Sequence, residues 1–187
     1  GLPFAFDAVS ASPLTRARET AEVIAAQLGG AGSDRSDRSD RSARAAAPRV
    51  AIDPDLAECT PPTRRADIMA EEKPEDLAAC SAQLERLAPR LLAPLPGGSP
   101  ARRELVVAHG NVIRWLVTRA LGVDTTAWLS MSIGHASVTT IAIDGKGAVR
   151  ILAVGDVGHL PPGLQTGAFG NRDKWDLEAS KVSEAAE

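Results

Sequence analysis

The chain has 187 residues, of which 44% are hydrophobic and 24% are charged, and its formal net charge is −3. This length favours one domain, and the composition is that of an ordinary globular protein. The small net charge gives no reason to expect nucleic acid or an anionic membrane as the main partner. The sequence contains no run of about 18 apolar residues, so no membrane span is predicted.

The N-terminal part predicts a strand over residues 6–10 followed by a helix. Ser12 suits the N-cap of this helix and Pro13 its first position, and the glycines at 29–30 suit its end. Residues 29–47 are of low complexity and contain Ser-Asp-Arg three times in succession. We therefore expect a disordered surface loop there, and the alternating charges disfavour a nucleic-acid-binding arm.

The middle of the chain combines a strand, an irregular region and a helix. Residues 49–53 are predicted as a strand, and the proline-rich residues 54–73 as irregular. Leucines at helical spacing predict a helix over 74–92. Residues 94–103 follow as a linker.

The C-terminal half begins with a strand at 104–108, a turn at 109–111 and a helix that ends at Gly122. Residues 128–131 are predicted as a further helical turn. Two strands then flank the turn Asp144-Gly145-Lys146-Gly147, which predicts a hairpin over 137–154. Strands that alternate with helices indicate an α/β domain with a mostly parallel sheet.

The two cysteines, Cys59 and Cys80, do not have the spacing of a metal or redox site. We therefore expect no disulfide and two reduced thiols, as in a reducing compartment. The chain begins at Gly1 without a methionine or a signal peptide, which suggests an incomplete N-terminus.

The turn His109-Gly110-Asn111 joins a predicted strand to a predicted helix. Ligands of open α/β sheets bind at that edge, and the start of a helix attracts phosphate. Glycine lets a ligand approach the backbone, and an imidazolium can bind a phosphoryl oxygen. The alternative for His109 is a structural histidine that closes the turn.

Two other side chains occupy similar positions. Arg16 follows the first strand, and its guanidinium can hold a phosphate through two hydrogen bonds; the alternative is a solvated arginine on a helix surface. Glu58 follows the strand at 49–53 and can act as a general acid, although loop glutamates are common. His135 and His159 are interpreted as loop residues.

Two stretches resemble motifs of the histidine phosphatase superfamily, whose fold is phosphoglycerate mutase-like. Residues 12–21 resemble its Ser-x-x-x-Arg-Ala-x-x-Thr-Ala motif, and residues 106–114 resemble its late histidine motif. The similarity runs from about residue 6 to 163, apart from the low-complexity insert. In the C-terminal half it is closest to a branch of mitochondrial serine/threonine protein phosphatases, on the stretches His109–Trp115, Arg119–Leu121, Trp128-Leu129, Ala136–Thr139 and Gly155–Pro162.

The resemblance implies a three-layer α/β fold, with helices on both faces of a mostly parallel sheet that lacks its first strand. This domain would cover residues 1–164, and residues 165–187 would form a polar tail. The implied substrate is a phosphorylated protein carrying phosphoserine or phosphothreonine. The implied location is the mitochondrion, with the cytoplasm as the alternative, and a homo-oligomer is possible.

The resemblance also assigns roles to single residues. Arg16 would clamp the phosphate, Glu58 would protonate the leaving oxygen, and His109 would be the second histidine that holds the phosphoryl group. The backbone at Gly110 or Asn111 would help to cradle it. No metal ion or other cofactor is implied.

The chain departs from the family pattern before Arg16. The family's nucleophile is a histidine in an Arg-His-Gly type motif at the end of the first strand, whereas none of the fifteen residues before Arg16 is histidine. We therefore expect an inactive fragment of a phosphatase that forms a phosphohistidine intermediate, with a second phosphate-binding arginine also missing. The alternatives are a pseudophosphatase that binds phosphopeptides or partners, and a small-molecule phosphatase or mutase.

Overall fold

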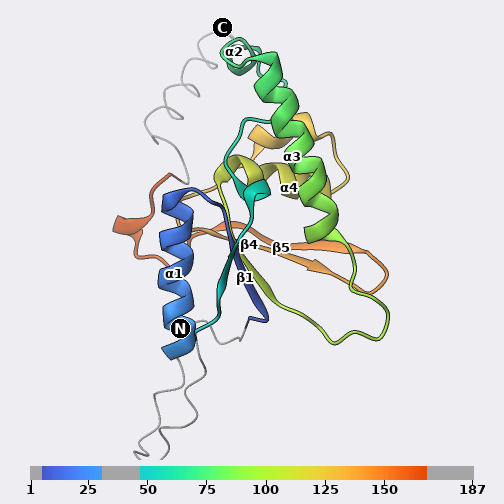
Figure 1. Cartoon of the computed structure of the whole chain (residues 1–187). Coiled ribbons are helices and arrows are strands. Elements are labelled where there is room, and N and C mark those ends of the chain that lie inside the picture. The colour runs from blue at the N-terminus through green and yellow to red at the C-terminus, as the bar shows by residue number, and fades with distance from the viewer. Residues whose placement is uncertain (1–5, 31–46, 168–187) are drawn as a thin grey trace, which may run out of the picture.

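The computed structural model describes residues 6–30 and 47–167, which form a mixed α/β fold (Figure 1). Strands and helices alternate through the first part of the chain, as the sequence predicts, and a hairpin follows. The elements in chain order are β1 (Ala8–Ala11), α1 (Thr15–Gly30), β2 (Val50–Ile52), η1 (Pro54–Leu56), α2 (Ala66–Met69), α3 (Pro74–Leu92), β3 (Glu104–Val107), α4 (Gly110–Ala120), η2 (Thr125–Ser130), β4 (Val138–Ile143), β5 (Val149–Asp156) and η3 (Pro162–Leu164).

The parallel sheet of the described residues has the strand order β2-β1-β3, with β1 in the middle. Val9 of β1 is buried and is aligned with Val50 on one side and with Leu105 on the other. The three strands predicted for this sheet are confirmed, although β1 begins two residues later than expected. Because all three run in the same direction, their carboxyl ends lie along one edge.

The hairpin of β4 and β5 is antiparallel and forms a two-stranded sheet of its own. In its predicted turn, a carboxylate oxygen of Asp144 accepts hydrogen bonds from the backbone N–H groups of Lys146 (2.8 Å) and Ala148 (2.9 Å). Gly147 has a φ of 84°, which a residue with a Cβ rarely adopts. The predicted turn and hairpin are confirmed.

The helices lie on different sides of the parallel strands. In Figure 1, α1 lies to the left of β1, whereas α3 and α4 lie above and to its right. Helix α1 packs against β1 and β2, while α4 packs against α3, η2 and β5. The sequence predicts α3 to the residue from leucines that recur on one face, and in the structure Pro74 lies in its first turn, where proline is tolerated.

The predicted start of the first helix is wrong. Helix α1 begins at Thr15, so neither Ser12 nor Pro13 takes its expected cap position. Ser12 instead accepts a hydrogen bond from the backbone N–H of Leu14 (3.2 Å), which lies before the helix. The side chain of Ser12 is fully buried and its oxygen lies beside His109.

The main hydrophobic cluster fills the space between α3, α4 and the segments that precede and follow them. Apolar burial of this kind is the main favourable contribution to folding. The cluster consists of Leu56, Cys80, Leu84, Leu87, Ala88, Val112, Trp115, Leu116 and Trp128. It therefore supports the segments that reach the carboxyl edge of the sheet after β2 and β3.

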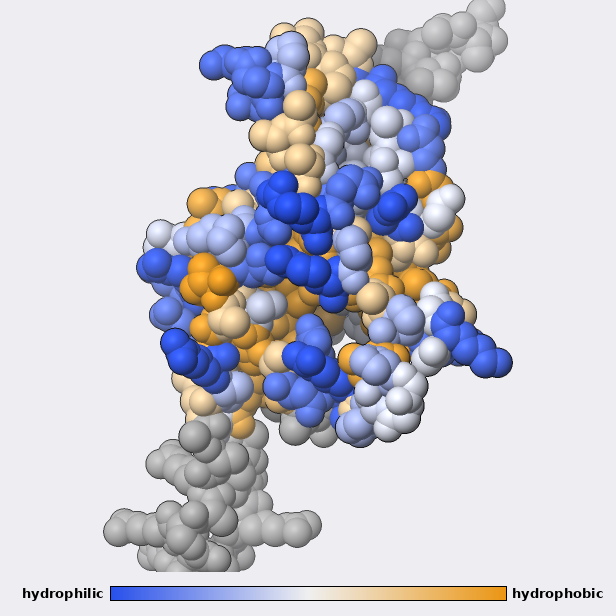
Figure 2. Space-filling model, turned by 45° about the vertical axis from the view of Figure 1, so that its right-hand side comes forward, coloured by the Kyte–Doolittle hydropathy of each residue, from blue (hydrophilic) through white to orange (hydrophobic). Residues whose placement is uncertain are grey.

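The face shown in Figure 2 is mixed, with hydrophobic patches between charged side chains. Among the described residues, no helix has the length and apolar character that crossing a membrane requires. Of the predicted loop at 29–47, residues 31–46 lie outside the described residues, and Gly29 and Gly30 belong to α1. Of the predicted tail, residues 168–187 also lie outside them.

Candidate active site

Three polar side chains follow the carboxyl ends of the three parallel strands. Arg16 lies in the first turn of α1 after β1, Glu58 follows β2 and η1, and His109 follows β3. Strands β2 and β3 both pair in parallel with β1. The topology therefore brings all three residues to one edge of the sheet, where ligands of open α/β sheets bind.

His109 is the N-cap residue of α4 and is 7% exposed. Its Nε2 lies 2.7 Å from the hydroxyl oxygen of Ser12. Its Nδ1 lies 3.5 Å from the Oε2 of Glu58. Two side chains from other parts of the chain thus fix the imidazole ring from opposite sides.

Glu58 is held at the start of α4. Its Oε1 accepts a hydrogen bond from the backbone N–H of Asn111 (3.2 Å). The free N–H groups and the partial positive charge of a helix start favour an anion at this position. The Asn111 N–H that the sequence assigns to phosphate is therefore occupied by Glu58 in this structure.

Burial raises the pKa of Glu58 above its usual value. The Asn111 hydrogen bond and the charges of Arg16 and Arg114 lower the same pKa, but burial outweighs them. A raised pKa increases the fraction of the neutral carboxyl, which is the form that can give up a proton.

Burial lowers the pKa of His109, and the positive charge of Arg16 lowers it further. The imidazolium form expected from the sequence is therefore disfavoured in the unliganded chain. The guanidinium of Arg16 acts on both His109 and Glu58, so it lies close to this pair. Its side chain is exposed, and within residues 6–30 and 47–167 no hydrogen bond or ion pair holds it.

Arg114 is a half-buried residue that the sequence analysis included in a motif without giving it a role. Its Nε donates to the carbonyl of Met131 (2.9 Å), and a terminal nitrogen donates to the Oδ1 of Asn111 (3.2 Å). Asn111 and Arg114 are three residues apart on one helix, and this spacing indicates that the two side chains are neighbours. Arg114 thereby joins the start of α4 to the segment before β4.

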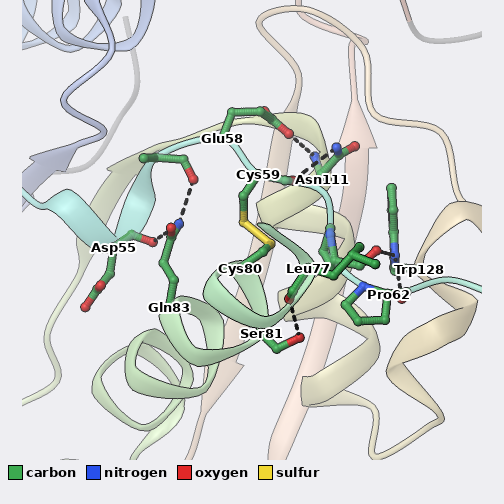
Figure 3. Close-up of a disulfide and its surroundings, with 12 residues drawn as sticks. Asp55, Glu58, Cys59, Pro62, Leu77, Cys80, Ser81, Gln83, Asn111 and Trp128 are labelled. Carbon is green, nitrogen blue, oxygen red and sulfur yellow. Dashed lines mark hydrogen bonds between the residues drawn. A yellow bond between two sulfur atoms is a disulfide. The ribbon is translucent and has the colours of Figure 1, made fainter. Parts of the chain in front are cut away.

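The Glu58 loop, which we define as residues 57–63, is attached at several points (Figure 3). The side-chain amide of Gln83 on α3 donates to the Ala57 carbonyl (2.7 Å). The side chain of Asn111 donates to the carbonyl of Cys59 (3.2 Å), and the indole N–H of Trp128 contacts the carbonyls of Pro61 and Pro62.

Cys59 and Cys80 form a disulfide that joins the Glu58 loop to α3 (Figure 3). The expectation of two reduced thiols is therefore wrong. The two cysteines are 21 residues apart, and one of them lies in a loop whose position depends on tertiary packing. Their spacing in the sequence gives no signal for this contact.

A pocket of about 350 Å³ opens beside Glu58 and the disulfide. Glu72 and Asp76 add two further carboxyl groups to its wall, and Thr60 and Gln83 add neutral polar groups. The surroundings of Glu58 are therefore acidic on the side that faces α3.

His135 and His159 lie in turns, as predicted, and both are exposed. The Nδ1 of His135 lies 3.0 Å from the hydroxyl oxygen of Thr166. Neither histidine makes a recorded contact with His109 or Glu58 within the described part of the chain.

Comparison with known proteins places the chain among histidine phosphatases. Residues 3–156 match the histidine phosphatase superfamily (branch 1). The mitochondrial serine/threonine-protein phosphatase Pgam5 of Drosophila virilis is 36% identical over 156 residues, which cover 83% of this chain and 50% of the relative. The protein of the same name from Caenorhabditis elegans is 47% identical over 68 residues, 34% of this chain and 24% of the relative.

The chain thus spans half or less of the length of these two curated relatives. Among solved structures, the phosphoglycerate mutase of Plasmodium falciparum has a TM-score of 0.55 and 23% identity, and the match covers 86% of this chain and 77% of that one. This likeness supports the predicted phosphoglycerate mutase-like fold. Since the family match extends over most of its length, the chain belongs to the histidine phosphatase superfamily.

Proposed function

We propose that this chain forms the phosphate-holding part of a phosphatase that hydrolyses phosphoric monoesters. The observation that carries the proposal is the contact of His109 with Glu58 at the sheet edge, close to the charge of Arg16. A guanidinium and an imidazole N–H can bind phosphoryl oxygens, and a carboxyl with a raised pKa can protonate a leaving alkoxide.

Each of the three residues has one role in this proposal. Arg16 binds two oxygens of the phosphoryl group, since its guanidinium is exposed and its fork geometry matches phosphate. His109 donates to a third oxygen from its Nδ1, which faces the Oε2 of Glu58 at 3.5 Å in the unliganded chain, because its Nε2 contacts Ser12 more closely, at 2.7 Å. Glu58 gives its proton to the oxygen that leaves as phosphorus becomes bonded to the attacking nitrogen.

The attacking nitrogen belongs, in this proposal, to a further histidine that is not one of the three in this chain. Both ring nitrogens of His109 contact side chains, and His135 and His159 are exposed turn residues. Attack forms a phosphohistidine, and water then breaks its N–P bond and releases phosphate. The chain on its own is therefore inactive.

We further propose that the substrate is phosphoserine or phosphothreonine in a protein and that the protein acts in mitochondria. The names of the Pgam5 relatives support both points. The pocket beside Glu58 adds a physical reason, since the carboxylates of Glu72 and Asp76 in its wall repel small metabolites that carry several negative charges. A peptide can instead present a neutral or basic side chain there.

The alternative is a pseudophosphatase that binds phosphopeptides or partners without hydrolysing them. The observation that favours it is that none of the three histidines in this chain is placed to attack. It differs from the first proposal in one result, because supplying the histidine motif of a Pgam5 relative to this chain would produce no turnover.

Calorimetric titration of residues 1–187 with inorganic phosphate tests the site. We expect binding that Arg16→Ala weakens by roughly tenfold or more, because charge-assisted hydrogen bonds are lost. Arg18→Ala is the control, since Arg18 is an exposed arginine of the same helix. Equal losses in the two variants would contradict the proposed role of Arg16.

Hydrolysis of p-nitrophenyl phosphate by the same samples tests the proposed inactivity. We expect no turnover above that of a buffer blank. Turnover that His109→Ala abolishes would instead identify His109 as the attacking group.

A further inference from the structure

The hydroxyl group of Ser12 is fully buried between two partners. The backbone N–H of Leu14 donates to its oxygen (3.2 Å). The Nε2 of His109 lies on another side of this oxygen, at 2.7 Å. No exposed surface of Ser12 remains through which water could provide a further partner.

These contacts determine where the hydroxyl proton lies. The oxygen already accepts from Leu14, so its own proton needs an acceptor, and Nε2 is the acceptor that the described residues place within hydrogen-bond distance. If Nε2 carried a proton itself, the hydroxyl proton would be buried without a partner, which is unfavourable. The arrangement therefore favours an unprotonated Nε2.

We propose that Ser12 is a positioning residue that holds His109 as the neutral Nδ1–H tautomer, so that an uncharged imidazole presents an N–H toward Glu58 and the phosphate. This inference rests on the phosphate site proposed above, and it adds a residue that the sequence analysis interpreted as a helix cap. It also explains how His109 can donate to an anion without being an imidazolium.

The charged groups around the ring agree with this assignment. The Oε2 of Glu58 lies 3.5 Å from Nδ1, where it attracts an N–H. Burial and, after it, the charge of Arg16 lower the pKa of His109, which favours the neutral ring, so the donated proton depends on the tautomer. The positive charge of Arg114 lowers the pKa of Glu58, so Arg114 affects the His109 ring only indirectly.

The order Ser12–His109–Glu58 has the same types of residue as the hydroxyl, imidazole and carboxylate of a serine hydrolase. The burial of Ser12 argues against that chemistry, since its oxygen has no exposed surface and accepts from Leu14. A substrate cannot reach this oxygen without opening the sheet edge. The physical evidence therefore supports a positioning role and not a nucleophilic one.

Long-range proton–nitrogen NMR spectra of the ¹⁵N-labelled chain test the tautomer directly. The chain has three histidines, and the His109 signals are those that disappear in His109→Gln. At pH 8 we expect a protonated Nδ1 and an unprotonated Nε2 in His109. In Ser12→Ala we expect a shift toward the Nε2–H tautomer, which histidine prefers in water, and phosphate binding about tenfold weaker.

Thr118→Ala is the matched control, because Thr118 also has a buried hydroxyl but donates to the carbonyl of Trp115. It should leave the His109 signals unchanged. A protonated Nε2 in the wild-type chain would overturn the proposal, even if Ser12→Ala does not fold. Unchanged His109 signals in a folded Ser12→Ala would overturn it too.

Phosphate titration of the same samples separates this inference from the proposed function. An Nδ1–H tautomer that depends on Ser12, in a chain that does not bind phosphate, would contradict the phosphate site but support the role of Ser12. Phosphate binding by a His109 that is protonated at Nε2 would support the site and overturn the role of Ser12.

Discussion

The two halves of the candidate site differ in how firmly the fold holds them. Glu58 and His109 form the fixed half, in which contacts with Ser12 and Asn111 define each side chain. Arg16 forms the free half, with an exposed guanidinium that no described residue holds. The groups proposed to donate protons are thus positioned in advance, while the group proposed to bind phosphate is not held by other described side chains.

This difference has an energetic meaning. Groups that are positioned before binding need no reorganisation during the reaction, which is the main source of electrostatic catalysis in many enzymes. An exposed arginine loses side-chain entropy when it closes on a ligand, and this loss weakens binding. The contrast predicts that changes in the fixed half affect stability, whereas changes at Arg16 affect binding.

Removing the disulfide is the strongest way to loosen the fixed half. We expect Cys59→Ala with Cys80→Ala to lower the free energy of unfolding by about 3 kcal/mol, because the unfolded chain gains the freedom of the opened loop. Urea unfolding of the variant and of the wild-type chain, each with and without a reductant, measures the effect. The reductant should lower the wild-type value alone, and equal stability in all four samples would contradict the contribution of the disulfide.

Arg114 offers a second test of the fixed half. We expect Arg114→Ala to cost about 2 kcal/mol, since the carbonyl of Met131 and the side chain of Asn111 both lose a charged donor. Arg119→Ala on the same helix is the control, because its ion pair with Glu85 is exposed and should contribute less than about 0.5 kcal/mol. Thermal unfolding compares the two, and similar losses would show that Arg114 is an ordinary surface residue.

The smallest expected effect concerns the buried charge of Glu58. Folding raises the pKa of Glu58 above its ordinary value of 4.5. The neutral carboxyl therefore contributes its full stability below pH 4.5, and this contribution is lost as the pH rises through the pKa of the folded chain. Glu58→Gln keeps an acceptor for Asn111 without the charge. We expect its Tm to exceed that of the wild-type chain by up to about 3 °C at pH 7 and to match it near pH 4.

Glu85→Gln, in which an exposed glutamate is changed, is the control for Glu58→Gln. A wild-type chain that is more stable than Glu58→Gln at pH 7 would show that Arg16 and Arg114 outweigh the cost of burial. Such a result would indicate that Glu58 is a carboxylate at pH 7 and does not serve as the acid.

The sequence predicts the elements of this fold better than the contacts between them. Helix α3 follows from its regularly spaced leucines, and the hairpin follows from the glycine-rich turn before β5. These signals are local, because each depends on residues within a few positions of one another. Their physical cause is therefore contained in short stretches of sequence.

The contacts that sequence reasoning missed are not local. Ser12 has a suitable type and position for a helix cap, and only the pairing of β1 with β3 brings it to His109. The disulfide likewise depends on how the Glu58 loop lies against α3. Sequence reasoning placed Arg16, Glu58 and His109 after three strands, but it could not show which neighbours would hold them.

The parallel pairing of β1 with β3 also determines when the site can form. Ala8 is aligned with Glu104, and Ser12 meets His109 across 97 positions of the chain. Contacts between such distant residues form slowly, since a long loop must close before they contribute any stability. A growing chain on the ribosome therefore has no such site until both β3 and the start of α4 have been synthesised, even if α1 is already helical.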